Sequence, residues 1–318
     1  MQDQSDRPPT DRCRAVRLEA FGGPDVLDVQ EIPSPQAGPG QVRVRVTAAG
    51  LNPMDWIMTA DADTAARFGL GLPAGFGTDY AGVVDQVGDG VTDFAPGDRV
   101  FGAALSRAVA DFVVIDPAAG IAANEAHHTP DGVDDLTAAT LAIAGRTASA
   151  ALAVVDPGPG DTVLIGGAAG GVGVFAVQLA RIAGARVVGT GSATSADFLR
   201  DLGAEPVTYG DGLAGRIRAL APGGVTAAVD LHGTETVHAA RELGVPDGRL
   251  CTIAAHVDGV PTANGANAAH GALEEVARLV AARRLRVPIA ASFPVEQIRR
   301  AAELQAGRHV HGKVVIDL

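Results

Sequence analysis

Residues 162–173 read TVLIGGAAGGVG, and this stretch decides the fold. Its first four residues form a short apolar run with glycine close on both sides, which is typical of a buried parallel strand. Residues 174–183 then have the apolar spacing of a helix, and RVVGT at 186–190 is a second strand. Together the three segments predict a strand–helix–strand unit of about the usual length.

The glycines between the first strand and the helix have a physical role. They let the backbone approach a pyrophosphate closely, and the helix offers it free N–H groups and the positive end of its dipole. A G-x-G-x-x-G pattern alone is weak, and Ala168 replaces its first glycine. The flanking strands strengthen it, although a turn used only for packing is the alternative. The predicted dinucleotide contacts are Ala169, Gly170, Gly171, Val172 and Gly173.

The end of the second strand indicates which dinucleotide is bound. An NAD site usually places Asp or Glu there, to accept hydrogen bonds from the ribose hydroxyls. This chain has Gly191 and Ser192 at that place, followed by Thr194 and Ser195. No carboxylate at this position would repel a 2′-phosphate, and hydroxyls can donate to it. The sequence therefore favours NADPH, with NADH as the alternative, and predicts contacts from Thr190 and Ser192.

Composition limits the class of protein. The chain has 318 residues, 47% hydrophobic and 19% charged, which indicates a globular protein large enough for two domains. Its net charge of −12 argues against nucleic acid or an anionic membrane as the main partner. Two cysteines, Cys13 and Cys251, give no disulfide framework, so we expect a cytoplasmic protein. Residues 1–12 are expected to be a flexible leader rather than a signal peptide.

Short β segments dominate the part of the chain before the glycine-rich turn. Residues 42–46, VRVRV, alternate strictly, as a half-exposed strand does. Further short runs separated by Gly and Pro turns follow between residues 75 and 102. This spacing predicts a partly closed β-barrel.

The chain resembles the medium-chain dehydrogenase/reductases, in particular their zinc-independent quinone oxidoreductase branch. The resemblance rests on the order and spacing of short segments along nearly the whole chain. These are LNPMD at 51–55, GTD at 77–79, GDRV at 97–100, AGRTA at 144–148, the 168–173 turn, LGA at 202–204 and GKVV at 312–315.

The resemblance implies two domains. A GroES-like β-barrel domain, residues 13–133 and 288–318, is interrupted by a Rossmann domain with a doubly wound parallel sheet at 134–287. Strand signals inside the Rossmann part predict six parallel strands, of which the last is at 285–287.

The sequence predicts no metal site. A structural zinc site usually needs several thiolates, and only two cysteines are present. Where the zinc alcohol dehydrogenases place a ligating cysteine, residues 48–52 are AAGLN. His127 and His128 are adjacent in a polar stretch, and we expect them to be solvated rather than ligating.

Without a metal, the expected substrate is a small apolar carbonyl compound that is already electron-poor, such as a quinone or an α,β-unsaturated ketone. The resemblance places Asn52 and Asp55 beside the nicotinamide, with Thr147 close by. Asn52 and Thr147 can donate to an oxygen that gains charge. Asp55 is either a proton relay or a structural residue, namely a helix N-cap or a turn residue. Trp56, where many relatives have a tyrosine just after this segment, makes the substrate face more apolar.

Other candidate residues lie further along the chain. Tyr209 ends the third strand, where the family uses a tyrosine beside the 2′-phosphate, but the lysine that relatives supply there is replaced by Ala196. His232 follows the fourth strand and is either a proton donor or a surface residue. Lys313 resembles the family's lysine near the cofactor, with an ordinary surface lysine as the alternative.

Three hypotheses follow. The first is an NADPH-dependent reductase of quinones or enones. The second is a natural-product tailoring enzyme on the same fold, including a non-redox one, and the third is a protein that binds NADPH without turnover. A homodimer is expected by analogy with the family.

Overall fold

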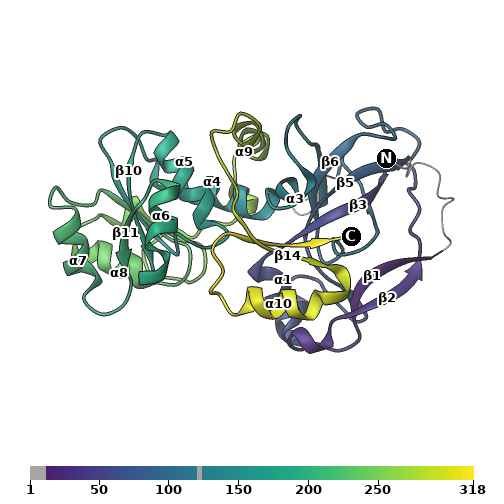
Figure 1. The fold of residues 1–318 in the computed structure, drawn as a ribbon, viewed down its shortest axis with the longest axis horizontal. Coiled ribbons are helices and arrows are strands. Elements are labelled where there is room, and N and C mark those ends of the chain that lie inside the picture. Colours follow the sequence, from purple (N-terminus) through teal and green to yellow (C-terminus); the bar gives the residue numbers. More distant parts are fainter. Residues whose placement is uncertain (1–11, 120–123) are drawn as a thin grey trace.

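The computed structural model describes residues 12–119 and 124–318, which form two bodies side by side (Figure 1). A parallel sheet flanked by helices lies on the left of the view, and mainly antiparallel strands lie on the right. The leader predicted for residues 1–12 lies outside the described residues, except for Arg12, which begins strand β1.

The parallel sheet is built on the apolar run that follows Thr162. Val163, Leu164 and Ile165 are fully buried. Val163 and Ile165 belong to one apolar cluster and Leu164 to another, because helices cover both faces of the sheet. Within the described residues the sheet has five strands, in the order β11-β10-β9-β12-β13. They are β9 (Thr162–Gly166), β10 (Arg186–Gly191), β11 (Glu205–Thr208), β12 (Ala227–Asp230) and β13 (Leu250–Thr252).

Helices alternate with these strands, so the predicted doubly wound sheet is confirmed. Helix α5 (Gly173–Ile182) begins at the end of the glycine-rich turn. The other helices of this part are α4 (Ala142–Val155), α6 (Ala196–Leu202), α7 (Leu213–Leu220), α8 (Glu235–Glu242) and α9 (Ala272–Ala281). Each helix in the described part of the chain is too short or too polar to traverse a bilayer.

The prediction of a sixth parallel strand at 285–287 is wrong. These residues form no strand, and β13 is the edge of the sheet. Instead, the side chain of Gln178 on α5 binds both backbone groups of Arg286. Its Oε1 accepts from the Arg286 N–H at 3.0 Å, and its Nε2 donates to the Arg286 carbonyl at 2.8 Å. The side-chain amide of Gln178 thus binds the backbone groups that a neighbouring strand would otherwise bind.

The antiparallel part is organised around β3 (Val42–Leu51), which pairs with β5, β7 and β15. Its main sheet has the order β14-β15-β3-β5-β6-β8, and a smaller sheet has the order β2-β1-β4. The predicted partly closed barrel is confirmed. Its other strands are β1 (Arg12–Leu18), β2 (Asp28–Pro33), β4 (Ala74–Gly75), β5 (Asp79–Val87), β6 (Arg99–Ala104), β7 (Phe112–Ile115), β8 (Asn124–His128), β14 (Ile289–Pro294) and β15 (Lys313–Asp317).

The C-terminal strand returns to the barrel, where β15 lies between β14 and β3. In Figure 1 the yellow C-terminal segment crosses back from the parallel sheet to the barrel. The domain limits at residues 134 and 287 stay predictions. The helices packed on the barrel are α1 (Pro53–Thr59), α2 (Ala62–Arg67), α3 (Asp135–Ala138) and α10 (Ile298–Ala306).

We expect Gln178→Met to lower the free energy of unfolding by about 1–3 kcal/mol, because methionine leaves both backbone groups of Arg286 without partners. Urea unfolding followed by circular dichroism measures the change. Gln297→Met is the matched control, since Gln297 is exposed, and it should stay within about 0.5 kcal/mol of the wild type. Equal stability of Gln178→Met and the wild type would contradict the capping role.

Candidate functional site

The glycine-rich turn between β9 and α5 is supported from β10. Gly167 has a positive φ of 66°, and its N–H donates to Oγ1 of Thr190 at 3.1 Å. A Cβ on Gly173 would lie 2.3 Å from the carbonyl oxygen of Gly167, so a larger residue does not fit there. Thr190, predicted as a cofactor contact, therefore supports the turn from behind.

The start of α5 leaves backbone donors free. Within the described ranges, the N–H groups of Gly171, Val172 and Gly173 have no hydrogen-bond acceptor. Free N–H groups together with the positive end of a helix dipole suit a phosphate. Ala169 and Gly170 precede them in the same turn. The residues present therefore fit the pyrophosphate of a dinucleotide.

A hydroxyl cluster, defined as Ser192, Thr194 and Ser195, follows β10. Oγ of Ser192 lies 2.8 Å from Oγ1 of Thr194 and 2.7 Å from Oγ of Ser195. Nε2 of His311, from the C-terminal segment, lies 2.9 Å from Oγ of Ser195. His311 did not emerge from the sequence, because only the folded chain brings it to this cluster. Tyr209 follows β11 beside it and is 51% exposed, and its N–H donates to Gly191.

A buried polar cluster, defined as Asn52, Asp79 and Lys313, lies at the end of β3. All three side chains are at most 3% exposed. Nζ of Lys313 donates to Oδ1 of Asn52 at 2.5 Å and to the Leu51 carbonyl at 3.2 Å. Nδ2 of Asn52 donates to Oδ2 of Asp79 at 2.9 Å. Because an ammonium only donates and a carboxylate only accepts, these bonds fix which way the Asn52 amide faces.

The charges in this cluster balance each other. Burial raises the pKa of Asp79 to about 6, although the nearby Lys313 ammonium, 3.8 Å away, acts in the opposite direction. Burial likewise lowers the pKa of Lys313, and the negative charges of Asp79 and Asp55 oppose that shift. The second oxygen of Asp79 accepts from the N–H of Ile143 at 3.0 Å. Asp79 therefore joins the barrel to the start of α4.

Asp55 belongs to the cap of a helix. Its Oδ2 accepts from the N–H of Asn52 at 2.8 Å, and its Oδ1 accepts from Oγ1 of Thr78 at 2.7 Å. With Asn52 it forms a capping box at the start of α1. Burial raises the pKa of Asp55 to about 7, and these two bonds limit the shift. The N-cap residue of α1 is therefore Asn52 rather than Asp55, and Asp55 supports the cap from the third helical position.

Lys313 connects the buried polar cluster to the glycine-rich turn. A Cβ on Gly171 would lie 3.2 Å from Cδ of Lys313, so the lysine stem passes beside the turn. The N–H of Gly312 donates to the carbonyl of Ala169 at 2.9 Å. The glycine-rich turn and Asn52 are therefore separated by about the length of one lysine side chain.

Three predicted residues lie near the site without bonding to the buried polar cluster. Nε1 of Trp56 donates to Gln305, and the Arg308 guanidinium lies 5.5 Å from the indole centroid, so Trp56 packs against α10. Oγ1 of the buried Thr147 donates to the carbonyl of Ile143 at 2.7 Å. His232 is exposed, and its Cβ lies 3.1 Å from where a Cβ on Gly167 would be, which places it beside the glycine-rich turn.

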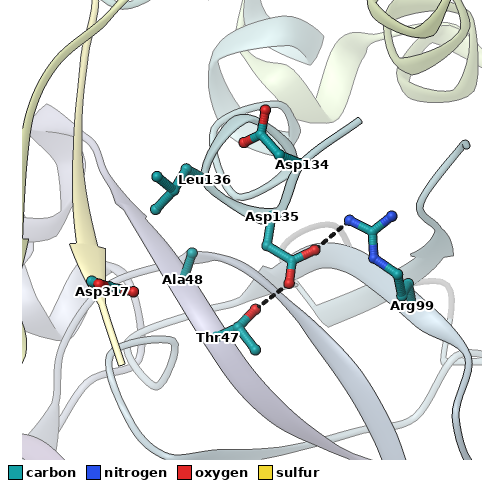
Figure 2. Close-up of a pocket in the computed structure, with 7 residues that line it drawn as sticks. All are labelled: Thr47, Ala48, Arg99, Asp134, Asp135, Leu136 and Asp317. Carbon is teal, nitrogen blue, oxygen red and sulfur yellow. Dashed lines mark hydrogen bonds and ion pairs between the residues drawn. The ribbon is translucent and has the colours of Figure 1, made fainter. Parts of the chain in front are cut away.

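A hollow of about 430 Å³ opens elsewhere, between β3, α3 and β15 (Figure 2). Asp135 there binds Oγ1 of Thr47 at 2.7 Å and the guanidinium of Arg99, and Asp134 caps α3. None of the predicted site residues lines it. The residues that do are Thr47, Ala48, Arg99, Asp134, Asp135, Leu136 and Asp317.

Possible metal ligands are scattered. In the residues that the structure describes, no three His, Cys, Asp or Glu side chains gather where a metal ion could be held. His127 and His128 were expected in a solvated stretch, but they end strand β8. Nδ1 of His127 lies 3.1 Å from Glu274 on α9.

Two family models match the chain. The model of the alcohol dehydrogenase GroES-like domain matches residues 38–113, and the model of the zinc-binding dehydrogenases matches residues 171–280. Among curated proteins, the quinone oxidoreductase of Pseudomonas aeruginosa is 34% identical over 247 residues, which are 75% of this chain and 72% of that protein.

Solved structures agree with these matches. The quinone oxidoreductase of Coxiella burnetii superimposes with a TM-score of 0.83 at 28% identity, over 96% of this chain and 99% of that one. A mycobacterial protein complexed with NADPH gives 0.82 at 28% identity, over 96% and 100%. The CurK enoyl reductase gives 0.83 at 25% identity, over 96% and 99%.

We expect Asp55 to make a contribution to the free energy of unfolding that is lost as pH rises from 3.8 to about 7, so the stability of Asp55→Asn relative to the wild type should rise over this range. A carboxyl whose pKa is raised on folding stabilises the protein below its unfolded pKa, and this contribution is lost as pH rises through the folded value. Urea unfolding at several pH values measures both slopes.

Asp61→Asn is the control for this titration. Asp61 caps α2, and hydrogen bonds from Thr64 lower its pKa, so its contribution has the opposite sign and is lost as pH falls. If Asp55→Asn followed the wild-type pH dependence unchanged, Asp55 would not titrate in this range.

Proposed function

Because the chain belongs to the quinone oxidoreductase branch of the medium-chain dehydrogenase/reductase superfamily, we propose that it is a zinc-independent, NADPH-dependent reductase. Family and fold support an oxidoreductase that uses a nicotinamide cofactor. The proposed acceptors are small apolar carbonyl compounds, either quinones or α,β-unsaturated ketones.

One observation carries this proposal. Lys313 runs from the glycine-rich turn, beside Gly171, to the amide of Asn52. A dinucleotide held by the free N–H groups of the turn would extend towards the end of the parallel sheet, where such cofactors react. In this proposal the Asn52 amide would lie close to the reacting end of the bound cofactor.

When bound, the reduced nicotinamide supplies the hydride. The protein's part is to orient the acceptor and to stabilise the charge that develops on its oxygen. Nδ2 of Asn52 carries two hydrogens, and one of them donates a hydrogen bond to Asp79. Lys313 occupies Oδ1, so the second Nδ2 hydrogen is the group that can donate to the acceptor's oxygen. The Thr147 hydroxyl donates to the Ile143 carbonyl. We therefore assign the hydrogen bond to the acceptor's oxygen to Asn52.

The proton that completes the reaction has a separate origin. Hydride addition to a quinone or an enone gives a phenolate or an enolate, and this anion then takes up a proton. We propose that the proton comes from water or from His232, which is exposed beside the glycine-rich turn. Asp55 is excluded from this role in the proposal because Asn52 and Thr78 occupy its two oxygens.

The preference for NADPH is supported by the hydroxyl cluster. Ser192, Thr194 and Ser195 stand where an NAD site has a carboxylate, and the acid that follows, Asp197, is exposed and paired with Arg200 at 2.6 Å. A structural neighbour was solved in complex with NADPH. NADH remains the alternative cofactor.

The acceptor class is supported by relatives. The curated relative from Pseudomonas aeruginosa is a quinone oxidoreductase, and CurK is an enoyl reductase. Quinones and enones share an electron-poor carbon next to a carbonyl group. This chemistry needs no Lewis acid, which agrees with a chain that has only two cysteines as possible thiolate ligands.

A second candidate is a tailoring enzyme on the same fold, including a non-redox one. Trp56 in place of a tyrosine favours it, because a general acid is missing there. A product formed without net consumption of NADPH would support this candidate. A non-catalytic protein would bind NADPH yet turn over no acceptor. We also propose a cytoplasmic homodimer, whose size light scattering at micromolar concentration determines.

We expect Gly170→Asp to weaken NADPH binding on the order of a hundredfold, because a carboxylate would face the pyrophosphate at close range. The one close neighbour of a Cβ on Gly170 would be the Gly167 carbonyl oxygen, at a tight 3.3 Å, so thermal melting checks that the variant is folded. Fluorescence titration with NADPH measures the affinity. Gly223→Asp is the matched control, because a Cβ there meets nothing within 4 Å. Equal weakening in both variants would place the dinucleotide elsewhere.

We expect the wild type to oxidise NADPH with at least one member of a quinone and enone panel. Asn52→Ala should then lower kcat on the order of 10²-fold with little change in NADPH affinity, because it removes a donor to the developing oxyanion. Steady-state kinetics measures kcat, and fluorescence titration measures the affinity. NADPH binding with no oxidation of any acceptor would favour the non-catalytic alternative instead.

A further inference from the structure

The C-terminal segment that leads into β15 reaches the hydroxyl cluster through His311. Its Nε2 lies 2.9 Å from Oγ of Ser195, a residue 116 positions earlier in the chain. The imidazole ring also stacks on Phe198 of α6, with centroids 5.1 Å apart. These two contacts fix the ring beside the end of β10.

This place decides which dinucleotide a Rossmann domain accepts, because the residue after the second strand faces the adenosine 2′ position. A 2′-phosphate there needs donors, and a positive charge strengthens each hydrogen bond. The hydroxyl cluster offers donors without charge. Ala196 offers neither, and the guanidinium of Arg200 is engaged with Asp197 at 2.6 Å. Near the hydroxyl cluster, His311 is the side chain in hydrogen-bond contact that can become positively charged.

We propose that His311 is a selectivity-determining residue, which binds the 2′-phosphate of NADPH as an imidazolium together with the hydroxyls of Ser192, Thr194 and Ser195. This inference rests on the proposed function, because it names the residue that sets the cofactor preference of that site. With the phosphate bound, Nε2–H of His311 donates to it. The Ser195 hydroxyl, which faces this Nε2 in the structure, becomes a second donor to the phosphate. The ring takes up a proton from solvent when the phosphate dianion binds.

The surroundings of His311 suit this role. The ring lines a hollow of about 430 Å³ between α6, the start of β14 and α10. The titratable side chains among the residues lining this hollow are His309 and His311. On the neighbouring turn of α6, Asp197 and Arg200 neutralise each other. Lys313, two residues further along the chain, is directed to Asn52 and cannot serve the phosphate at the same time.

A structural alternative makes a different prediction. If His311 only ties the C-terminal segment to α6, its loss would affect NADPH and NADH binding alike. If it binds the 2′-phosphate, its loss affects NADPH alone, because NADH carries a hydroxyl there.

Isothermal titration calorimetry of NADPH and of NADH separates these cases, using the wild type, His311→Gln and His309→Gln. Glutamine keeps a hydrogen-bonding group but carries no charge. We expect His311→Gln to weaken NADPH on the order of ten- to a hundredfold and to leave NADH unchanged. His309→Gln should change neither. Thermal melting of each variant checks that it is folded.

Titrations in buffers of different ionisation enthalpy supply a second readout. The wild type should take up protons with NADPH and fewer with NADH, and His311→Gln should lose this difference. An unchanged NADPH-to-NADH ratio in His311→Gln, or a loss that appears in His309→Gln instead, would overturn the assignment and leave the proposed reductase intact. A wild type that binds neither dinucleotide would overturn both.

Discussion

A buried lysine joins the C-terminal strand β15 to the end of β3 in the barrel. Taking an ammonium out of water is costly, and Lys313 offsets this cost through the Leu51 carbonyl, the Asn52 amide oxygen and the nearby Asp79. Removing one partner of such a group leaves a charge buried without compensation. The same bonds align β15 with the end of β3 and set the orientation of the Asn52 amide. Stability and site geometry therefore depend on one set of contacts.

The features that the sequence predicted well are local. The apolar run at 163–165 and the glycines after it define a strand, a turn and a helix within residues 162–182, and period-2 alternation marks β3. The cap of α1 was placed correctly in this segment, but its N-cap residue is Asn52, and Asp55 supports it three residues later. Patterns of this kind are decided by neighbouring residues, so the sequence carries them directly.

The features that the sequence missed depend on contacts between distant residues. Residues 285–287 have the composition of a strand, yet Gln178, over a hundred positions earlier, binds their backbone and the chain turns away to β14. His311 gained its role only because the C-terminal segment passes α6. Lys313 was expected near the cofactor, and its stem does lie beside Gly171, but its ammonium is directed to Asn52. A pattern of neighbouring residues in the sequence does not reveal contacts between residues that are far apart in the chain.

The position of β15 between β14 and β3 also constrains how the chain is made. One edge of β3 pairs with β5, which is synthesised early. On the other edge, residues 42–45 pair with β7, which leaves the ribosome soon afterwards, but residues 48–51 must wait for β15. The lysine that joins them lies 262 positions downstream of Leu51. The parallel-sheet domain, which is continuous in sequence, can fold as a unit during that interval. Until β15 has been synthesised, the nascent barrel therefore carries an open strand edge, the kind of surface that chaperones shield from aggregation.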